Sequence, residues 1–176
     1  MRNLIPFFII GVLMVLLLGA CNKDSVTTTS SRGSYSMKLT YNDTIANFNT
    51  CVVSTVIQGN TPSEILISGY NTTNNKISGK SFELDLVGDV DSLKAGQVFP
   101  AATTSNQLHS STLYFFPDSV KTYTTQLANP IGVVTITSVT AYEIKGTFTG
   151  GLYGWQDAYA VILDYTISSG TFVARR

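Results

Sequence analysis

Ser81-Phe82-Glu83-Leu84-Asp85-Leu86-Val87 is the stretch of this 176-residue chain that decides its fold. Its apolar side chains, Phe82, Leu84 and Leu86, alternate with the acidic Glu83 and Asp85. A period of two places successive side chains on opposite faces of a strand, so one face enters a core and the other faces outward. The stretch therefore predicts a half-buried β-strand with both acids on its outer face.

The same alternation begins the domain at Ser36–Tyr41, where Met37, Leu39 and Tyr41 share one face. Further short segments rich in β-branched and aromatic residues follow, separated by clusters of turn residues. They are Asn49–Ile57, Glu64–Tyr70, Ser111–Phe116, Lys121–Gln126, Gly132–Val139, Tyr142–Phe148, Val161–Ile167 and Gly170–Ala174. We therefore expect one all-β domain over residues 34–176, a β-sandwich or open barrel of about nine to ten antiparallel strands.

The first 21 residues follow a different pattern. Arg2 precedes an apolar run from Leu4 to Leu18, and small residues close the run. A positive start, an apolar core and a small-residue cut site are typical of a secretory signal peptide. The alternative, an uncleaved membrane-spanning helix, needs about 20 apolar residues, and Pro6 and Gly11 weaken a run that is already shorter.

Leu18-Gly19-Ala20-Cys21 resembles the bacterial lipobox. The resemblance implies a signal peptide over residues 1–20, diacylation of the Cys21 thiol, cleavage before it and acylation of the new amine. Each buried methylene contributes about 0.8 kcal/mol, and stable anchoring takes more than one acyl chain. The resemblance therefore predicts a lipid anchor in a membrane.

Residues 21–33 carry the anchor and a Ser- and Thr-rich segment that we expect to be a flexible tether. By resemblance to lipoprotein sorting rules, Asn22 favours the outer membrane. Lys23-Asp24 is similar to the surface-export signal of Bacteroidetes-type lipoproteins, in which a lysine accompanies acidic residues. Both the periplasmic face and the cell surface stay open as addresses.

Charge and cysteine content exclude several functions. Eleven basic and eleven acidic residues balance, and no basic stripe appears, which disfavours nucleic-acid binding. Because Cys21 is assigned to lipid, Cys51 has no partner for an intrachain disulfide. We expect Cys51 to be a small buried hydrophobe, since a reactive thiol needs a histidine or cation beside it.

Catalytic and metal-binding patterns are weak. His109 is the single histidine, it lies in a polar stretch, and no Gly-x-Ser-x-Gly elbow accompanies it. Asp85, Asp89 and Asp91 could offer oxygens to calcium, but their spacing is not that of an EF-hand, so a solvated acidic loop is favoured. The glutamates, Glu64, Glu83 and Glu143, are all expected outward. We predict no enzyme activity, no cofactor and no metal; three or more acids converging in a deep cleft would favour a hydrolase instead.

The segment Tyr153–Tyr159 contains the only tryptophan of the chain, Trp155, in a glycine-containing connection between two predicted strands. Tyr153, Trp155 and Tyr159 could stack on a sugar ring while Gln156 and Asp157 bond its hydroxyls. The alternative is that these aromatic rings cap the core at the ends of strands.

The pattern Asp-(Ser/Thr)-apolar recurs along the chain. Its hydroxyl residues are Ser25, Thr44, Ser92 and Ser119. The pattern is similar to the O-glycosylation motif of Bacteroidetes-type exported proteins, which implies glycans on one or more of these four residues. Turn chemistry of Asp followed by Ser or Thr is the alternative explanation.

Three glycine-containing segments near the C-terminus, Gly132–Ile136, Ile144–Gly150 and Ile167–Phe172, are similar to the last strands of small uncharacterised Bacteroidetes-type lipoproteins. The resemblance implies a β-rich envelope domain and brings no catalytic residues. In physical terms, a glycine opposite a phenylalanine permits a close approach of strands or a bulge. We therefore expect a lipid-anchored outer-membrane protein that binds an envelope protein or has a structural role. The alternative is a surface glycan-binding accessory module that uses Trp155.

Overall fold

A computed structural model describes residues 34–58, 61–73, 76–88, 91–104, 107–118, 120–126, 129–155 and 160–176. Within these ranges the chain forms strands and turns but no helix, which confirms the all-β prediction. The strands are β1 (Ser36–Tyr41), β2 (Thr44–Phe48), β3 (Thr50–Gln58), β4 (Thr61–Thr73), β5 (Lys76–Val87), β6 (Val98–Pro100), β7 (Ser110–Phe116), β8 (Tyr123–Thr124), β9 (Gly132–Val139), β10 (Glu143–Trp155) and β11 (Val161–Arg175).

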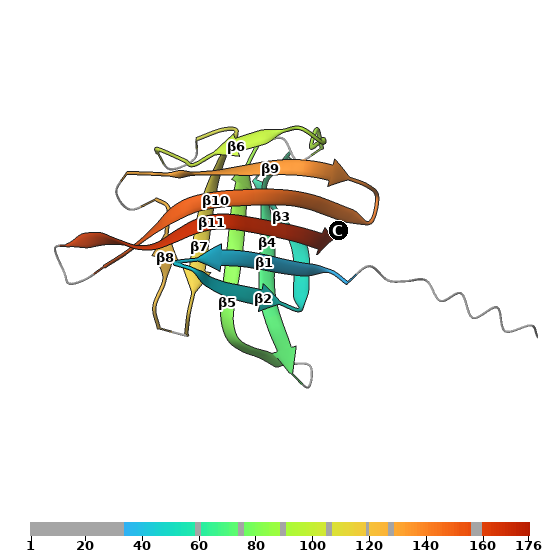
Figure 1. Ribbon diagram of the computed structural model, residues 1–176. Coiled ribbons are helices and arrows are strands. Elements are labelled where there is room, and N and C mark those ends of the chain that lie inside the picture. Colours follow the sequence, from blue (N-terminus) through green and yellow to red (C-terminus); the bar gives the residue numbers. More distant parts are fainter. Residues whose placement is uncertain are drawn as a thin grey trace, which may run out of the picture. The chain divides into compact units, whose positions relative to one another are not determined.

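The strands form one mixed sheet in the order β2-β1-β11-β3-β4-β5-β7-β8-β10-β9-β6. β11 also pairs with β10. The series of neighbouring strands from β11 through β3, β4, β5, β7, β8 and β10 therefore ends again at β11. Figure 1 shows β1, β2, β9, β10 and β11 crossing in front of β3, β4, β5 and β7. The core lies between these two groups of strands.

The structure departs from the expected nine to ten antiparallel strands in two respects. The described residues form eleven strands, because the polar β2 and the short β6 carry little apolar periodicity. β11 and β3 pair in parallel through Arg175 and Val52, a contact that no local pattern indicates. Conversely, the two segments expected at the C-terminus, Val161–Ile167 and Gly170–Ala174, belong to one strand, β11. In place of a turn between them, the pairing of β11 with β1 and β10 shifts register near Ser168.

The core contains the residues that alternation assigned to it. Phe82 and Leu84 are fully buried and Leu86 is 1 % exposed, while Glu83 and Asp85 lie on the other face of β5. The β1 residues Met37, Leu39 and Tyr41 join the same cluster, together with Cys51, Ile65, Ile67, Phe99, Leu113, Phe115, Val134, Ile136, Ile144, Leu152 and Ile167. Burial of large apolar side chains is the main favourable term in folding.

Glycine–phenylalanine pairs lock β10 to β11. Gly146 lies opposite Phe172, and Phe148 lies opposite Gly170. A Cβ on either glycine would clash with the ring of its partner. Each ring therefore lies over a bare stretch of the neighbouring strand, as the sequence pattern indicated.

Candidate binding surfaces

The residues assigned to the anchor, including Cys21 and Ser25, lie outside the described residues. In the part of the chain that the structure describes, no helix is long and apolar enough to cross a membrane.

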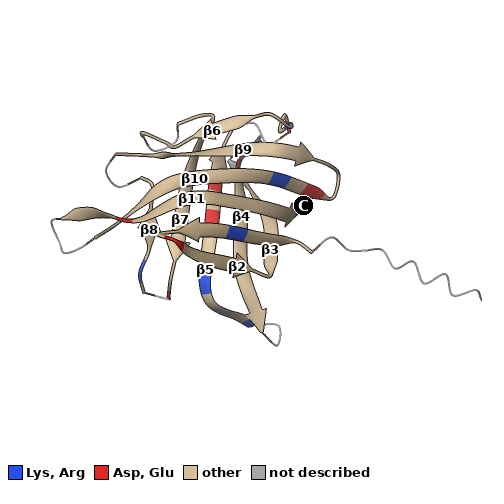
Figure 2. Ribbon diagram, viewed as in Figure 1, with Lys and Arg blue, Asp and Glu red and all other residues tan. Residues whose placement is uncertain are grey.

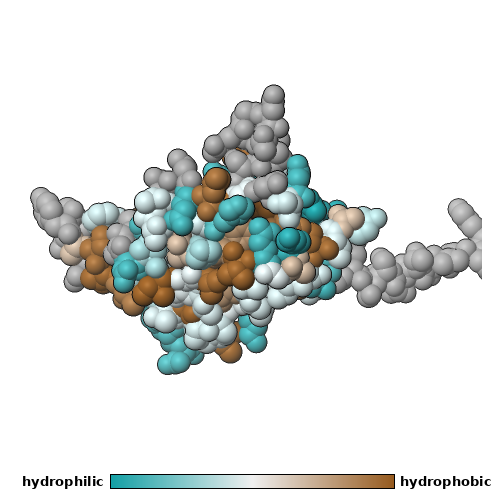
Figure 3. Space-filling model, turned by 90° about the horizontal axis from the view of Figure 1, so that it is seen from above, coloured by the Kyte–Doolittle hydropathy of each residue, from teal (hydrophilic) through white to brown (hydrophobic). Residues whose placement is uncertain are grey.

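Trp155 lies at the end of β10, opposite Val161 of β11, and its side chain is 60 % exposed. It borders a hollow of about 250 Å³ whose other lining residues are Val120, Lys121, Thr122 and Tyr123. Figure 3 shows apolar surface toward the left end of the molecule, where the β10–β11 hairpin lies. An exposed indole beside hydroxyl and ammonium groups can stack on a flat ring while its neighbours bond polar substituents.

The two tyrosines predicted to accompany Trp155 have different places. Tyr153 is buried, with 8 % of its surface exposed, and its hydroxyl donates a hydrogen bond of 2.9 Å to the carbonyl of Asn129. The Tyr153 ring is therefore buried and does not join Trp155 on the surface. Tyr159 lies outside the described residues.

Tyr123 stands beside Trp155 in place of the predicted tyrosines. Its ring packs against the bare backbone of Gly154 and meets the Tyr165 ring edge-on, with 4.8 Å between the centroids. These contacts hold the ring in place. No sequence pattern predicted this pairing, because Tyr123 is 32 positions from Trp155 and lies in a two-residue strand.

Acidic side chains gather on the outer face of the sheet at β4 and β5, where Figure 2 shows two red bands on β5. The pKa of Asp85 is raised to about 6, first by burial and then by the negative charges of Glu64 and Glu83. Ser68 donates a hydrogen bond of 3.0 Å to Glu83, whereas Oδ1 of Asp85 is buried with no partner among the described residues. Burial and the same three acids also raise the pKa of Tyr114.

These acids do not converge on a point. Among the described residues, no group of three or more His, Cys, Asp or Glu side chains is placed to hold a metal ion. Asp89 lies outside the described residues and Asp91 is exposed. Glu143, on β10, forms an ion pair of 2.8 Å with Lys145.

The remaining nucleophile candidates are separate. Cys51 is fully buried, as predicted, and burial raises the pKa of its thiol to about 12, so the thiol stays protonated at neutral pH. His109 is exposed in a turn with a φ of 57°. The two residues lie on β3 and directly before β7, which do not pair with each other.

The candidate O-glycosylation motifs differ in the exposure of their apolar third position. Thr44 and Ser92 are both exposed, and Ser119 lies outside the described residues. The apolar third position is 57 % exposed at Ile45 but only 9 % exposed at Leu93. Thr44 thus belongs to a triplet whose three residues are all exposed.

Turn chemistry also operates at one of these motifs. Asp118 accepts hydrogen bonds of 2.8 Å from the backbone N–H groups of both Val120 and Lys121. These bonds lower the pKa of its carboxyl. The aspartate of this motif therefore has a structural role in its own turn.

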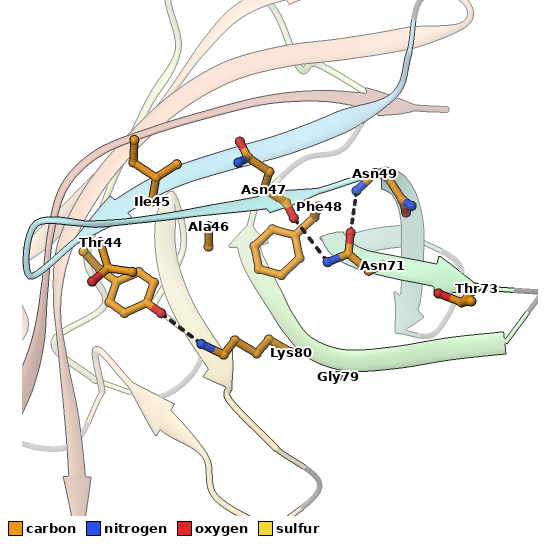
Figure 4. A pocket seen from close by; sticks show the side chains of 11 residues that line it. Thr44, Ile45, Ala46, Asn47, Phe48, Asn49, Asn71, Thr73, Gly79 and Lys80 are labelled. Atoms are coloured by element: carbon orange, nitrogen blue, oxygen red, sulfur yellow. Dashed lines mark hydrogen bonds between the residues drawn. The ribbon is translucent and has the colours of Figure 1, made fainter.

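A larger hollow, of about 520 Å³, lies between β2 and the end of the β4–β5 hairpin. Figure 4 shows Lys80 and Asn71 facing β2 across it. The sequence did not predict this groove, because its residues come from strands that alternation either missed (β2) or extended too little (β4 and β5). The Asn42-Asp43 turn was the available signal, since a two-residue turn implies a second strand after it.

Comparison of the chain with known protein families, curated proteins and solved structures finds no match.

Proposed function

We propose that the protein is a lipid-anchored protein of the cell envelope, held in the outer membrane through Cys21, whose β domain acts by binding or as a structural component and not by catalysis. The observation that carries the proposal is the lipobox-like Leu18–Cys21 at the end of an apolar signal. We take the domain to be a β-sandwich or open barrel, because two crossed groups of strands enclose one core.

The positions of the two ends of β11 are consistent with an anchored binding domain. The first strand, β1, begins at Ser36, which pairs with Val173 near the C-terminal end of β11. Trp155 pairs with Val161 at its other end. At roughly 3.3 Å per residue, about 40 Å of strand separates these positions. The chain therefore enters the domain far from Trp155, which leaves the Trp155 surface accessible when the N-terminus is tethered.

Replacement of Cys21 tests the anchor. In the bacterial host, Cys21→Ala should abolish incorporation of radiolabelled palmitate and leave an uncleaved precursor. Cys51→Ala is the matched control, since its buried thiol is not a lipidation site, and it should label like the wild type. Equal labelling of Cys21→Ala and the wild type would overturn the proposal.

A second candidate function is glycan binding at Trp155, in a surface accessory module. It is favoured by the 60 % exposure of Trp155 beside Tyr123, Lys121 and Thr122. Binding on a glycan array should be lost in Trp155→Ala and kept in Tyr142→Ala, a matched control whose ring is 76 % exposed elsewhere. If no immobilised glycan binds the wild type, this candidate is excluded and the structural role remains.

Glycosylation of Ser25, Thr44, Ser92 or Ser119 is a further part of the proposal. The intact mass of protein purified from its host should exceed that of the lipidated polypeptide, and Thr44→Ala should remove part of the excess. A mass equal to the lipidated polypeptide alone would rule the modification out.

A further inference from the structure

The outer edge of β2 has backbone groups available for pairing. β2 ends the strand order and pairs only with β1, to which the two-residue turn Asn42-Asp43 joins it. Positive φ angles of 42° and 61° at the turn are those of a tight hairpin, in which the flanking Tyr41 and Thr44 form a hydrogen-bonded pair. Hydrogen-bonded pairs alternate with non-bonded ones, so the backbone groups of Ile45 and Asn47 point away from β1.

A side chain confirms this direction. Nδ2 of Asn71 donates a hydrogen bond of 3.2 Å to the backbone carbonyl of Asn47, from the side opposite to β1. Oδ1 of Asn71 accepts a bond of 2.9 Å from the N–H of Asn49. The amide therefore closes the edge at this end, and the N–H and C=O of Ile45 and the N–H of Asn47 still face the groove.

The groove beside this edge has room for a strand. Its volume is about 520 Å³, and it is lined on the core side by Tyr41, Ala46 and Phe48 and on the far side by Thr73, Gly79 and Lys80. Figure 4 shows open space between β2 and the bent end of β5. An added strand lies about 4.8 Å from its neighbour, and an exposed edge is a template for such pairing.

A bulge in β5 places a positive charge over the groove. Tyr70 pairs with Ser81 but the next residue, Asn71, pairs with Ser78, so Gly79 and Lys80 are extra residues. Gly79 has a φ of 71°, which favours glycine and bends the strand. Nζ of Lys80 then lies 3.2 Å from the Tyr41 hydroxyl and 5.9 Å from the centre of its ring.

The charge of Lys80 is uncompensated in this groove. No carboxylate of the described residues forms an ion pair with it, and no acidic residue lines the groove. Bulges next to functional sites commonly re-aim a side chain, and here the bulge turns Lys80 toward the free edge of β2.

We propose that this groove binds an extended peptide segment of a partner protein that carries an acidic side chain. The peptide pairs with β2 through the backbone groups of Ile45 and Asn47, and its carboxylate meets Lys80. Strand addition to a sheet edge is a general mode of peptide recognition, in which backbone bonds supply affinity and alternate side chains supply specificity. The proposal does not depend on the lipid anchor or on glycan binding at Trp155.

The test uses the purified full-length protein in detergent micelles, labelled with 15N-isoleucine, and the peptide Ac-Thr-Val-Glu-Val-Thr-NH2. The amide proton of Ile45, assigned by its loss in Ile45→Val, should shift downfield on titration because it gains a hydrogen bond. Three backbone bonds and one charged contact predict roughly millimolar affinity.

Two sets of controls separate strand pairing from other contacts. Two peptides are N-methylated at alternate residues, one in each of the two possible phases, and both keep the side chains of the parent. The peptide of one phase should bind about tenfold more weakly because it cannot pair with Ile45. Lys80→Gln should weaken binding of the acidic peptide but not binding of a version with glutamine in place of glutamate. Lys38→Gln, an exposed lysine of β1 outside the groove, is the matched control and should change neither.

Three outcomes would overturn the proposal. The Ile45 amide could remain unshifted at several millimolar peptide, both N-methylated phases could bind like the parent, or the acidic and neutral peptides could bind Lys80→Gln and the wild type alike. A shift of the Ile45 amide by oligosaccharides but not by the peptide would assign the groove to sugars. A shift on increasing protein concentration alone would assign it to a second copy of the chain.

Discussion

The β4–β5 and β10–β11 hairpins both run past the strands beside them, and they end in opposite chemistry. In Figure 1 the first projects downward and the second to the left. Past the last pair with β7, Ser81–Phe116, the first hairpin carries mainly asparagine, threonine and lysine side chains, with one exposed apolar residue, Ile77. Past the last pair with β9, Gly150–Gly132, the second exposes Trp155, Ile162 and Leu163. One end offers mainly hydrogen bonds and positive charge, and the other offers mainly apolar surface.

The two hairpins are also held in different ways. The β4–β5 hairpin is tied to the β2–β3 corner by side-chain amides: Asn71 bonds the backbone of Asn47 and Asn49, and Asn49 bonds the backbone of Thr72. The β10–β11 hairpin is also tied by an amide, since Asn42 bonds the backbone of Asp164 and Thr166, but in addition rings and aliphatic groups pack on its bare glycine backbone. The difference shows that apolar packing on glycine can supplement amide bonds in holding a hairpin outside the core, and each kind of contact fails under a different substitution.

The largest effect is expected from Gly154→Ala in the β10–β11 hairpin. The new Cβ would clash with the Tyr123 ring and lie 2.7 Å from Oδ2 of Asp164. Because Tyr165 packs edge-on against Tyr123, the ring cannot easily move away. We expect a loss of about 2–3 kcal/mol in the free energy of unfolding, measured by urea denaturation and circular dichroism.

Gly79→Ala in the β4–β5 hairpin is the matched variant. A Cβ there meets nothing within 4 Å, so its cost comes from the φ of 71° alone. That strain is worth about 1 kcal/mol. A greater loss for Gly79→Ala than for Gly154→Ala would contradict the distinction between conformational and packing control.

The next effect is expected from Asn71→Ala, which removes the amide bonds to Asn47 and Asn49. Two hydrogen bonds at a partly exposed site predict a loss of about 1–2 kcal/mol by urea denaturation. Trp155→Ala, on the other hairpin, should change stability by less than about 0.5 kcal/mol because the side chain is mostly in solvent. Equal losses for the two would show that the amides do not hold the β4–β5 hairpin.

Asn71→Ala also sharpens the proposal of strand addition. It frees the carbonyl of Asn47, which adds a fourth backbone group to the available edge. If the groove binds an extended peptide, this variant should bind the acidic peptide more tightly although it is less stable. Opposite changes in stability and affinity are not expected from a merely structural amide.

Alternation was sufficient to predict the parts of the fold whose one face is buried. It gave the inward residues of β1 and β5 directly, because Met37 and Phe82 each begin a run in which every second side chain is apolar. It failed for β2, where Ile45 is exposed and the strand contributes mainly a polar edge. It also ended β10 too early, since Gly150, Gly151 and Gly154 are typical of a turn but here admit neighbouring side chains.

Candidate sites were less predictable than strands, because they combine residues that are distant in sequence. Trp155 was identified from its type and its glycine neighbours. The buried Tyr153 bonds the carbonyl of Asn129, and the groove is lined by Asn47, Asn71 and Lys80. Long-range pairing and a two-residue bulge bring these groups together, and neither has a local signal.

A further effect concerns the base of the β4–β5 hairpin, where Asp85 lies on the acidic face with a pKa raised to about 6 from 3.8. Because the folded-state pKa exceeds the unfolded value, the native state binds the proton more tightly, and Asp85 disfavours folding by an amount that grows between about pH 4 and pH 6 and is complete above that range. Asp85→Asn removes this penalty. It should stabilise the protein by about 1 kcal/mol at pH 7.5 after allowance for solvent screening, and the gain should fade between pH 6 and pH 4.

The cause of the shift can be tested with Glu64→Gln, since Glu64 is the larger of the two charges that raise the pKa of Asp85. With that charge removed, the gain in stability from Asp85→Asn should be smaller, and the pH at which the gain fades should be lower. Urea denaturation of the wild type, the two single variants and the double variant at a series of pH values measures both quantities. A gain from Asp85→Asn that is the same at pH 4 and pH 7.5 would mean that the substitution acts through packing and not through the proton.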